Sequence, residues 1–158
     1  MKTTQKRKPN AFSLVELLMV LTIISIMAAL IINAFSNAAK DTNSIISRQQ
    51  QAVLESAVMN AISQYMVSGY TLEEGRRYYM YANSTDGTKR TMKERLALIQ
   101  PYLKDEVYDH IASRSSANTV QSAAMIKTSQ YVEFEDWSAA TAANRNTYPK
   151  VSLKTITP

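Results

Sequence analysis

The chain has 158 residues, a length that suits one domain or one domain with an anchor. Its formal charge of +5 does not indicate a nucleic-acid-binding protein, because Lys2, Lys6, Arg7 and Lys8 supply four of the positive charges in a short N-terminal stretch. Cysteine is absent, which excludes a disulfide framework and any Cys-based metal site.

A long apolar run follows this basic leader. Residues 17–39 contain no charged side chain, and Glu16 stands at the start of the run. At about 1.5 Å per residue, a helix of this length crosses a hydrocarbon core of about 30 Å. A carboxylate costs free energy in hydrocarbon, so Glu16 is predicted to have a functional role and a charged partner. The run therefore predicts a membrane-spanning helix with one functional carboxylate.

Taken together, the basic leader, the Ala11-Phe12 step, Glu16 and the apolar span resemble the class III signal of prepilins. Prepilins are the precursors of type IV pilins and type II secretion pseudopilins. In this superfamily a prepilin peptidase cuts before an aromatic residue, and the new N-terminus is N-methylated. The resemblance implies cleavage between Ala11 and Phe12, methylation of Phe12, and a role for Glu16 in setting the register between subunits. The family usually has Gly before the cut, where this chain has Ala11.

The resemblance also implies a function. The chain is expected to be a structural subunit of a type IV pilus-like or type II secretion pseudopilus filament, without catalytic residues, cofactor or metal. It is expected in the inner membrane as a single-pass protein with its head outside the cytoplasm, and later in a periplasmic or cell-surface filament. Implied partners are other pilin-like subunits, the prepilin peptidase, membrane lipid, and an inner-membrane assembly platform with its ATPase. Nucleic acid is not among the predicted partners. Many type IV pilins close a C-terminal loop with a disulfide, which this chain cannot form, so a pseudopilin or minor subunit is slightly favoured.

Two other interpretations of the N-terminal segment stay open. An ordinary secretory signal also has a basic start and an apolar core, and residues 36–38 (Ser-Asn-Ala) offer a cleavage site that would give a secreted protein. Alternatively, the chain is a monomeric, membrane-anchored binding protein with a helical stalk. The length of the apolar run and the position of Glu16 favour the prepilin signal.

The predicted fold class is α+β, in the form of the pilin lollipop. No Pro or Gly occurs between Phe12 and Ser68, and Gly69 supplies a helix stop, so one helix is predicted over about residues 12–68. Many pilins carry a Gly and a Pro within this span, whereas Ser25 and Asn33 stand here, which favours a continuous helix. The predicted parts are a leader (1–11), a membrane or filament-core half (12–39), an amphipathic half (40–68) and a globular head (69–158).

The amphipathic half shows a stripe at helical spacing that is predicted to pack on the head. Its members are Ile46, Val53, Ala57, Ala61, Ile62 and Tyr65. In the head, the patterns predict a turn over 83–87, a helix over 91–100, a further helical segment from Pro101 to about Ile111, and strands over 123–127, 131–135 and about 150–157. Within the middle strand, Val132 and Phe134 share the apolar face. The resemblance implies that the strands form a small antiparallel sheet.

The remaining polar residues predict little chemistry. His110 is the only histidine and is predicted to lie at the surface or at a helix end. Glu133, Glu135 and Asp136 match no calcium-binding loop, so a solvated strand face is predicted instead of a cation site. An aromatic-basic cluster comprises Tyr70, Arg76, Arg77, Tyr78, Tyr79 and Tyr81. It is predicted to serve core and interface packing, in preference to stacking on sugars or single-stranded nucleic acid.

Overall fold

The computed structural model describes residues 13–82, 87–138 and 147–156. The leader, the Ala11-Phe12 step and most of the predicted turn over 83–87 lie outside these residues. The chain forms two compact units, one extending to Ala39 and the other beginning at Lys40.

The helix α1 begins at Leu14 and ends at Val67. This confirms the prediction of one long, uninterrupted N-terminal helix, which continues through the positions of Ser25 and Asn33. It ends where Gly69 adopts a positive φ of 96°, a conformation that glycine reaches without a side-chain clash. The N–H of Gly69 donates to the carbonyl of Met66 at 3.0 Å and closes the last turn.

In the second unit, α1 buries a stripe of side chains against the head. The buried residues are Ser47, Leu54, Ala57, Val58, Ala61 and Ile62. The prediction is confirmed for Ala57, Ala61 and Ile62, but it is wrong for Ile46 and Val53, which are 36% and 45% exposed. The stripe passes through Ser47, whose hydroxyl donates to the carbonyl of Asn43 at 2.8 Å and so loses no hydrogen bond on burial. A pattern of apolar residues does not include Ser47, because serine is polar.

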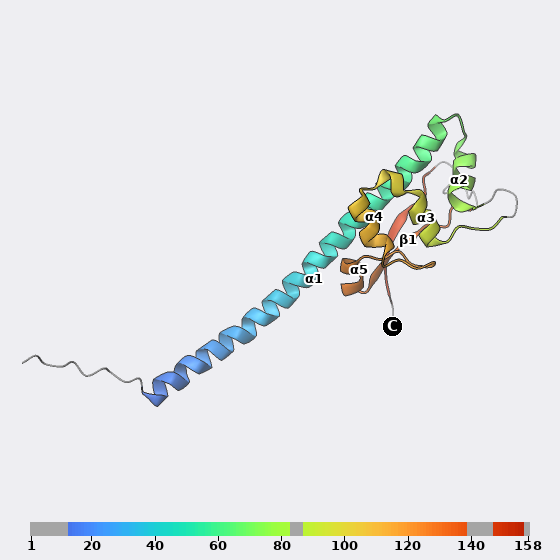
Figure 1. Cartoon of the computed structure of the whole chain (residues 1–158). Helices are drawn as coiled ribbons and strands as arrows, with labels where there is room; N and C mark the ends of the chain where they lie inside the picture. The colour runs from blue at the N-terminus through green and yellow to red at the C-terminus, as the bar shows by residue number, and fades with distance from the viewer. Residues whose placement is uncertain (1–12, 83–86, 139–146, 157–158) are drawn as a thin grey trace, which may run out of the picture. The chain divides into compact units, whose positions relative to one another are not determined.

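Short helices lie beside this part of α1, as Figure 1 shows. They are α2 (Leu72–Met80), α3 (Met92–Leu98), the 3-10 turn η1 (Gln100–Tyr102), α4 (Asp105–Ala112) and α5 (Ala123–Lys127). The helix predicted over 91–100 and the helical segment after Pro101 are confirmed as α3, η1 and α4. The helix α2 was not predicted. Its Thr-x-x-Glu spacing was a signal for it, because Thr71 and Glu74 form a capping box.

The predicted strand over 123–127 is wrong, because these residues form α5. Ser122 precedes the helix with extended backbone angles, and its hydroxyl accepts the N–H of Met125 at 3.3 Å. This N-cap satisfies a donor that would otherwise lack a partner in the first turn. Five mostly apolar residues are too few to show a helical or a strand periodicity. The N-cap at Ser122 therefore favours a helix here.

Two strands form an antiparallel sheet in the described part of the chain. They are β1 (Gln130–Phe134) and β2 (Val151–Thr155), paired so that Val132 lies opposite Leu153 and Phe134 opposite Val151. The predicted alternation is confirmed, since Val132 and Phe134 are buried and their neighbours in β1 are partly exposed. The expected α+β class, with one long helix, short helices and a small antiparallel sheet, is thus confirmed.

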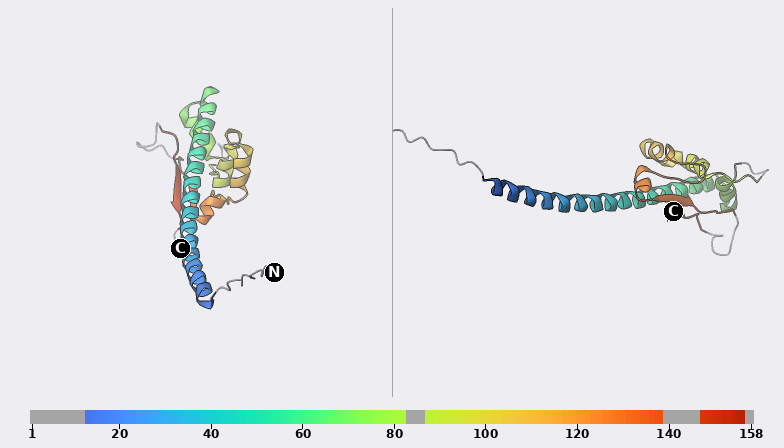
Figure 2. Two further views of the ribbon diagram at one scale, coloured as in Figure 1. Left: turned by 90° about the vertical axis from the view of Figure 1, so that its left-hand side faces the viewer. Right: turned by 90° about the horizontal axis from the view of Figure 1, so that it is seen from below.

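Polar contacts fasten the sheet and α5 to the second unit's part of α1, and both views in Figure 2 show these elements beside it. The side-chain amide of Gln51 donates to the carbonyl of Val151 at 2.7 Å. The hydroxyl of Ser122 donates to the side-chain oxygen of Gln50 at 2.6 Å. The largest fully buried side chains include Trp137, Tyr79, Phe134, Leu54, Ile62 and Leu96. They come from α1, α2, α3, β1 and the segment after β1, which together enclose one core.

Candidate functional site

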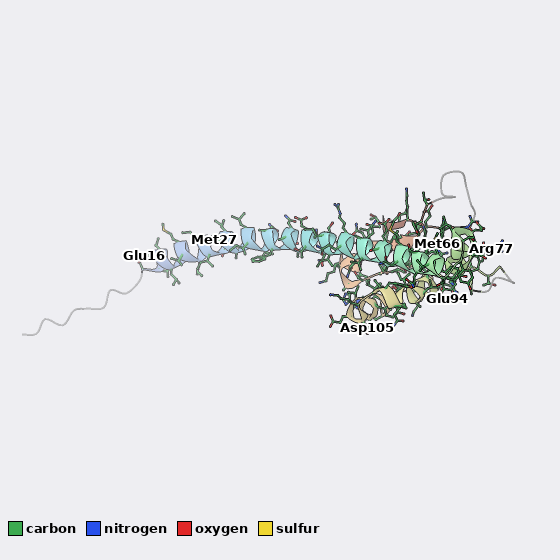
Figure 3. The ribbon with its side chains drawn as sticks, turned by 90° about the horizontal axis from the view of Figure 1, so that it is seen from above. Glu16, Met27, Met66, Arg77, Glu94 and Asp105 are labelled. Carbon is green, nitrogen blue, oxygen red and sulfur yellow. The ribbon has the colours of Figure 1, made fainter. Side chains whose placement is uncertain are left out.

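The candidate site is the N-terminal end of α1, where Glu16 occupies the first turn (Figure 3). The N–H of Ser13 donates to Oε2 of Glu16 at 2.9 Å, and the N–H of Glu16 donates to the hydroxyl oxygen of Ser13 at 3.2 Å. This reciprocal pair is a capping box, which satisfies two donors at the open end of the helix. Sequence reasoning identified Glu16 but missed Ser13, although the Ser-x-x-Glu spacing was the signal that could have found it.

The capping box also has an electrostatic consequence. The N-terminal end of a helix carries partial positive charge, which stabilises a nearby carboxylate by about 0.3–1 kcal/mol at an exposed site. The box engages Glu16 through Oε2, and no described residue donates to Oε1. The carboxylate is therefore held at the start of the helix with one oxygen able to accept a further donor.

Beyond the capping box, α1 is apolar on all sides. The exposed apolar side chains are Leu14, Val15, Leu17, Leu18, Met19, Val20, Leu21, Ile23, Ile24, Ile26, Met27, Leu30, Ile31, Ile32 and Phe35. None of the most apolar 18-residue window is buried within the chain itself. A helix that is apolar all round suits a lipid or helix-bundle environment.

Two hydroxyl groups within the apolar segment are satisfied locally. Thr22 donates to the carbonyl of Met19 at 2.8 Å, and Ser25 donates to the carbonyl of Leu21 at 2.7 Å. A hydroxyl without a partner would cost free energy in hydrocarbon, so these bonds make both residues compatible with a membrane. By length and composition, α1 qualifies as a membrane-spanning helix.

The three acidic residues at and after the end of β1 make structural contacts. Glu133 pairs with Lys154 at 3.5 Å, and Glu135 accepts the backbone N–H of Lys150 at 2.8 Å. Asp136 pairs with Lys89 at 2.8 Å, and hydrogen bonds from Lys89 and Ser138 lower the pKa of Asp136 to about 2. Among the described residues, no three His, Asp or Glu side chains converge on a possible metal position.

His110 lies exposed in the last turn of α4, as predicted. The aromatic-basic cluster divides into two parts. Tyr79 is fully buried, and burial raises the pKa of its phenol, while Arg76 is mostly buried and pairs with Glu73. These two residues pack the head as predicted. The other part, with Tyr78 and Arg77, lines a hollow that is described below.

Comparison with known proteins agrees with the geometry at the start of α1. The family model of the prokaryotic N-terminal methylation motif matches residues 6–32, a range that contains the Ala11-Phe12 step, the capping box and most of the apolar segment. No curated protein and no solved structure shows a significant match to this chain. The chain therefore carries the prepilin-type signal of type IV pilins and pseudopilins, a family of structural subunits and not of enzymes.

Proposed function

We propose that this chain is a subunit of a type IV pilus-like or type II secretion pseudopilus filament. In this account it enters the inner membrane through residues 12–39, loses residues 1–11 to a prepilin peptidase, is methylated at Phe12 and polymerises through α1. The observation that supports this most strongly is that three features coincide in one stretch: the methylation motif at residues 6–32 contains the capped helix start and most of the exposed apolar surface.

The helix start is compatible with the proposed cut. The capping residue is Ser13 and α1 begins at Leu14, so cleavage before Phe12 leaves the capping box and the whole helix in the mature subunit. The new terminal amine belongs to the residue immediately before the cap. An α-amino group has a pKa of about 7.7–8.0 in water, so it carries positive charge at neutral pH.

In this account Glu16 pairs with the terminal amine of Phe12. Oε2 remains in the capping box, and Oε1 accepts the amine of Phe12 from the same subunit or from its neighbour. Two opposite charges that pair in a low-dielectric environment offset the desolvation cost that each would bear alone. A subunit that docks so that its amine meets a carboxylate is held in register with the one before it.

The apolar surface provides the remaining interactions. In the membrane the exposed side chains of residues 14–35 face lipid, and in a filament they face the same segment of neighbouring subunits. Ser25, Ala28 and Ala29 permit close approach of helices, and the hydroxyl of Ser25 is already satisfied within its own helix. Residues 40–68 support the head, which occupies residues 69–158 and faces outward.

Shearing of filaments from native-host cells tests this proposal. The sheared fraction should contain the chain without residues 1–11, because only processed subunits polymerise. Ala11→Glu should abolish cleavage, since the peptidase requires a small residue at this position, and the uncut chain should stay in the membrane fraction. Shearing recovers only surface filaments, so crosslinking of whole cells tests for a periplasmic pseudopilus. The proposal fails if the uncut Ala11→Glu chain enters filaments as readily as wild type, or if the wild-type chain is absent from sheared filaments and also forms no crosslinked multimers in the cell.

A further inference from the structure

A hollow of about 420 Å³ opens in the second unit beside the C-terminal end of α1. Its lining includes Tyr65, Glu74, Arg77, Tyr78, Tyr81 and Arg90, and we call it the tyrosine-arginine hollow. Figure 3 labels Met66, near the end of α1, and Arg77 of α2. The volume lies in the range of small-molecule sites, about 300–1,000 Å³. A second hollow of about 340 Å³ shares Arg77 and Tyr81 as lining, so the two lie next to each other.

Aromatic rings form a layered wall on this surface. Tyr65 stacks on Tyr70 with ring centroids 4.4 Å apart and on Tyr78 with centroids 4.5 Å apart, and both pairs are nearly parallel. Tyr70 and Tyr78 remain 48% and 41% exposed, a large fraction for aromatic side chains that are already stacked. Such a wall is suited to a further planar ring, because stacking of a base on an aromatic side chain is favourable for every base.

The neighbouring acids take part in helix caps and ion pairs, although Glu74 also lines the hollow, where the charge of Arg77 acts on it. Glu73 is held by Arg76, and Oε2 of Glu74 accepts the backbone N–H and the hydroxyl of Thr71, both at 2.8 Å. These hydrogen bonds from Thr71 lower the pKa of Glu74, so it is ionised and committed to its cap. Oε2 of Glu94 accepts the same two donors from Thr91, at 2.7 and 2.9 Å.

Arg77 and Arg90, the two arginines of the hollow, have fewer close polar contacts than these acids. Arg77 is well exposed and reaches Glu73 only at 3.9 Å. Arg90 donates through Nε to the carbonyl of Tyr78 at 3.2 Å, and its guanidinium carbon lies 5.9 Å from the ring centroid of Tyr78. Among the described residues its terminal nitrogens make no hydrogen bond, although its positive charge also helps to lower the pKa of Glu94. A guanidinium matches a phosphate with two parallel hydrogen bonds, and two of them beside an aromatic wall favour a ligand with both an anionic group and a planar ring.

We propose that the tyrosine-arginine hollow binds a nucleotide unit. The base lies against the rings of Tyr78 and Tyr81, and Arg77 and Arg90 hold the phosphate. This chemistry has two sources, a free mononucleotide or one unit of a single-stranded nucleic acid, and the adjacent hollow provides space for a second unit. The inference goes beyond the proposed filament role, and its test depends on neither cleavage nor assembly.

Fluorescence anisotropy of the full chain in a nonionic detergent tests the inference. The probe is a labelled oligothymidylate of about 12 nucleotides, within the site sizes of single-strand binders. Two phosphate contacts predict that a tenfold rise in salt weakens binding about 25-fold. A mononucleotide that displaces the probe at equal concentration of units identifies the free nucleotide as the source, and displacement by the oligomer alone identifies the single strand. Absence of probe binding at low salt, or equal displacement by a polyuronate, overturns the inference.

Variants locate the binding. Arg77→Ala with Arg90→Ala should weaken probe binding by about tenfold or more at low salt and flatten the salt dependence. Arg114→Ala with Lys127→Ala is the matched control, because it removes two exposed charges from α5 and the segment after α4 and should leave affinity unchanged. Tyr78→Leu should weaken binding about fivefold or more, while Tyr78→Phe keeps the ring and the affinity. Equal binding by the double arginine variant and its control, with both folded by circular dichroism, contradicts the inference.

Discussion

At the scale of single residues, Ser13 and Glu16 determine how α1 begins. Their reciprocal hydrogen bonds give the carboxylate a structural role in the helix start, in addition to the charge pairing that we propose for it. The two roles make different demands on the side chain. A cap needs only a hydrogen-bond acceptor, whereas pairing with a terminal amine needs a negative charge. Substitution of Glu16 by a neutral acceptor therefore separates them.

We predict that Glu16→Gln and Glu16→Ala both insert and are cleaved, and that both assemble poorly. The glutamine retains an acceptor for the N–H of Ser13, but it leaves the amine of Phe12 without a counter-charge, at a cost of several kcal/mol in a low-dielectric environment. Quantitative immunoblotting of sheared filaments should show at least a tenfold loss for both variants, since about 1.4 kcal/mol already corresponds to tenfold. Normal assembly of Glu16→Gln would show that the cap, and not the charge pair, is the essential contribution.

A second residue-scale prediction concerns the ion pair between Asp136 and Lys89. The folded-state pKa of Asp136 is lowered from 3.8 to about 2, so the pair stabilises the folded state above about pH 4 and this contribution disappears as the pH falls towards 2. Asp136→Asn should lower the free energy of unfolding at neutral pH by less than about 1 kcal/mol, because the pair is largely exposed. The difference from wild type should vanish at the acid end.

Urea unfolding followed by Trp137 fluorescence measures this difference, because Trp137 is the only tryptophan and is buried in the second unit. Lys89→Met is the control variant, because it removes the other charge of the same ion pair. The double variant should be no less stable than either single variant, since only one interaction is removed. A difference between wild type and Asp136→Asn that persists unchanged at the acid end would contradict the assignment.

At the scale of elements, sequence patterns succeeded where one signal dominated. The long helix follows from the absence of Pro and Gly between Phe12 and Ser68 and from the apolar run, and β1 follows from strict alternation. The predictions were wrong or incomplete where a local hydrogen bond determines the secondary structure. The N-cap at Ser122 favours helix α5 over the predicted strand, and the capping box at Thr71 begins α2 in a segment whose aromatic and charged residues show no clear helical pattern.

The candidate site was predictable in part for the same reason. Glu16 is conspicuous as a charge at the start of an apolar run, whereas Ser13 is informative only through its spacing to Glu16. The tyrosine-arginine hollow was predictable only in part. The sequence places Arg77, Tyr78 and Tyr81 in one aromatic-basic cluster, but tertiary packing alone brings Tyr65 of α1 and Arg90, which follows α2, into the same lining.

The position of the buried stripe on α1 gives an element-scale prediction with a built-in control. Leu54 is fully buried and its neighbour Val53 is 45% exposed. Leu54→Ala should lower the free energy of unfolding of the second unit by about 2–5 kcal/mol through lost packing and the cavity that remains. Val53→Ala should change it by less than about 0.5 kcal/mol, as for most surface substitutions. Trp137 fluorescence in urea measures both, and equal effects of the two substitutions would contradict the placement of the stripe.

At the scale of the whole molecule, the two units differ in what they need from their surroundings. The second unit encloses its own core around Trp137, Tyr79 and Phe134. The described residues of the first unit have no buried side chains, and their apolar surface requires lipid or other helices to cover it. A chain with these two properties and a methylation motif at residues 6–32 suits a subunit that is stored in a membrane and transferred to a helical filament core.

Intact mass spectrometry of the protein extracted from membranes of its native host tests this account most directly. The account predicts a single species that begins at Phe12 and carries one additional methyl group, because processing precedes assembly. A species that begins at Ala39 would identify a secreted protein released by an ordinary signal peptidase. A full-length chain that still carries residues 1–11 would identify a stalked membrane anchor, and either result would contradict the filament account.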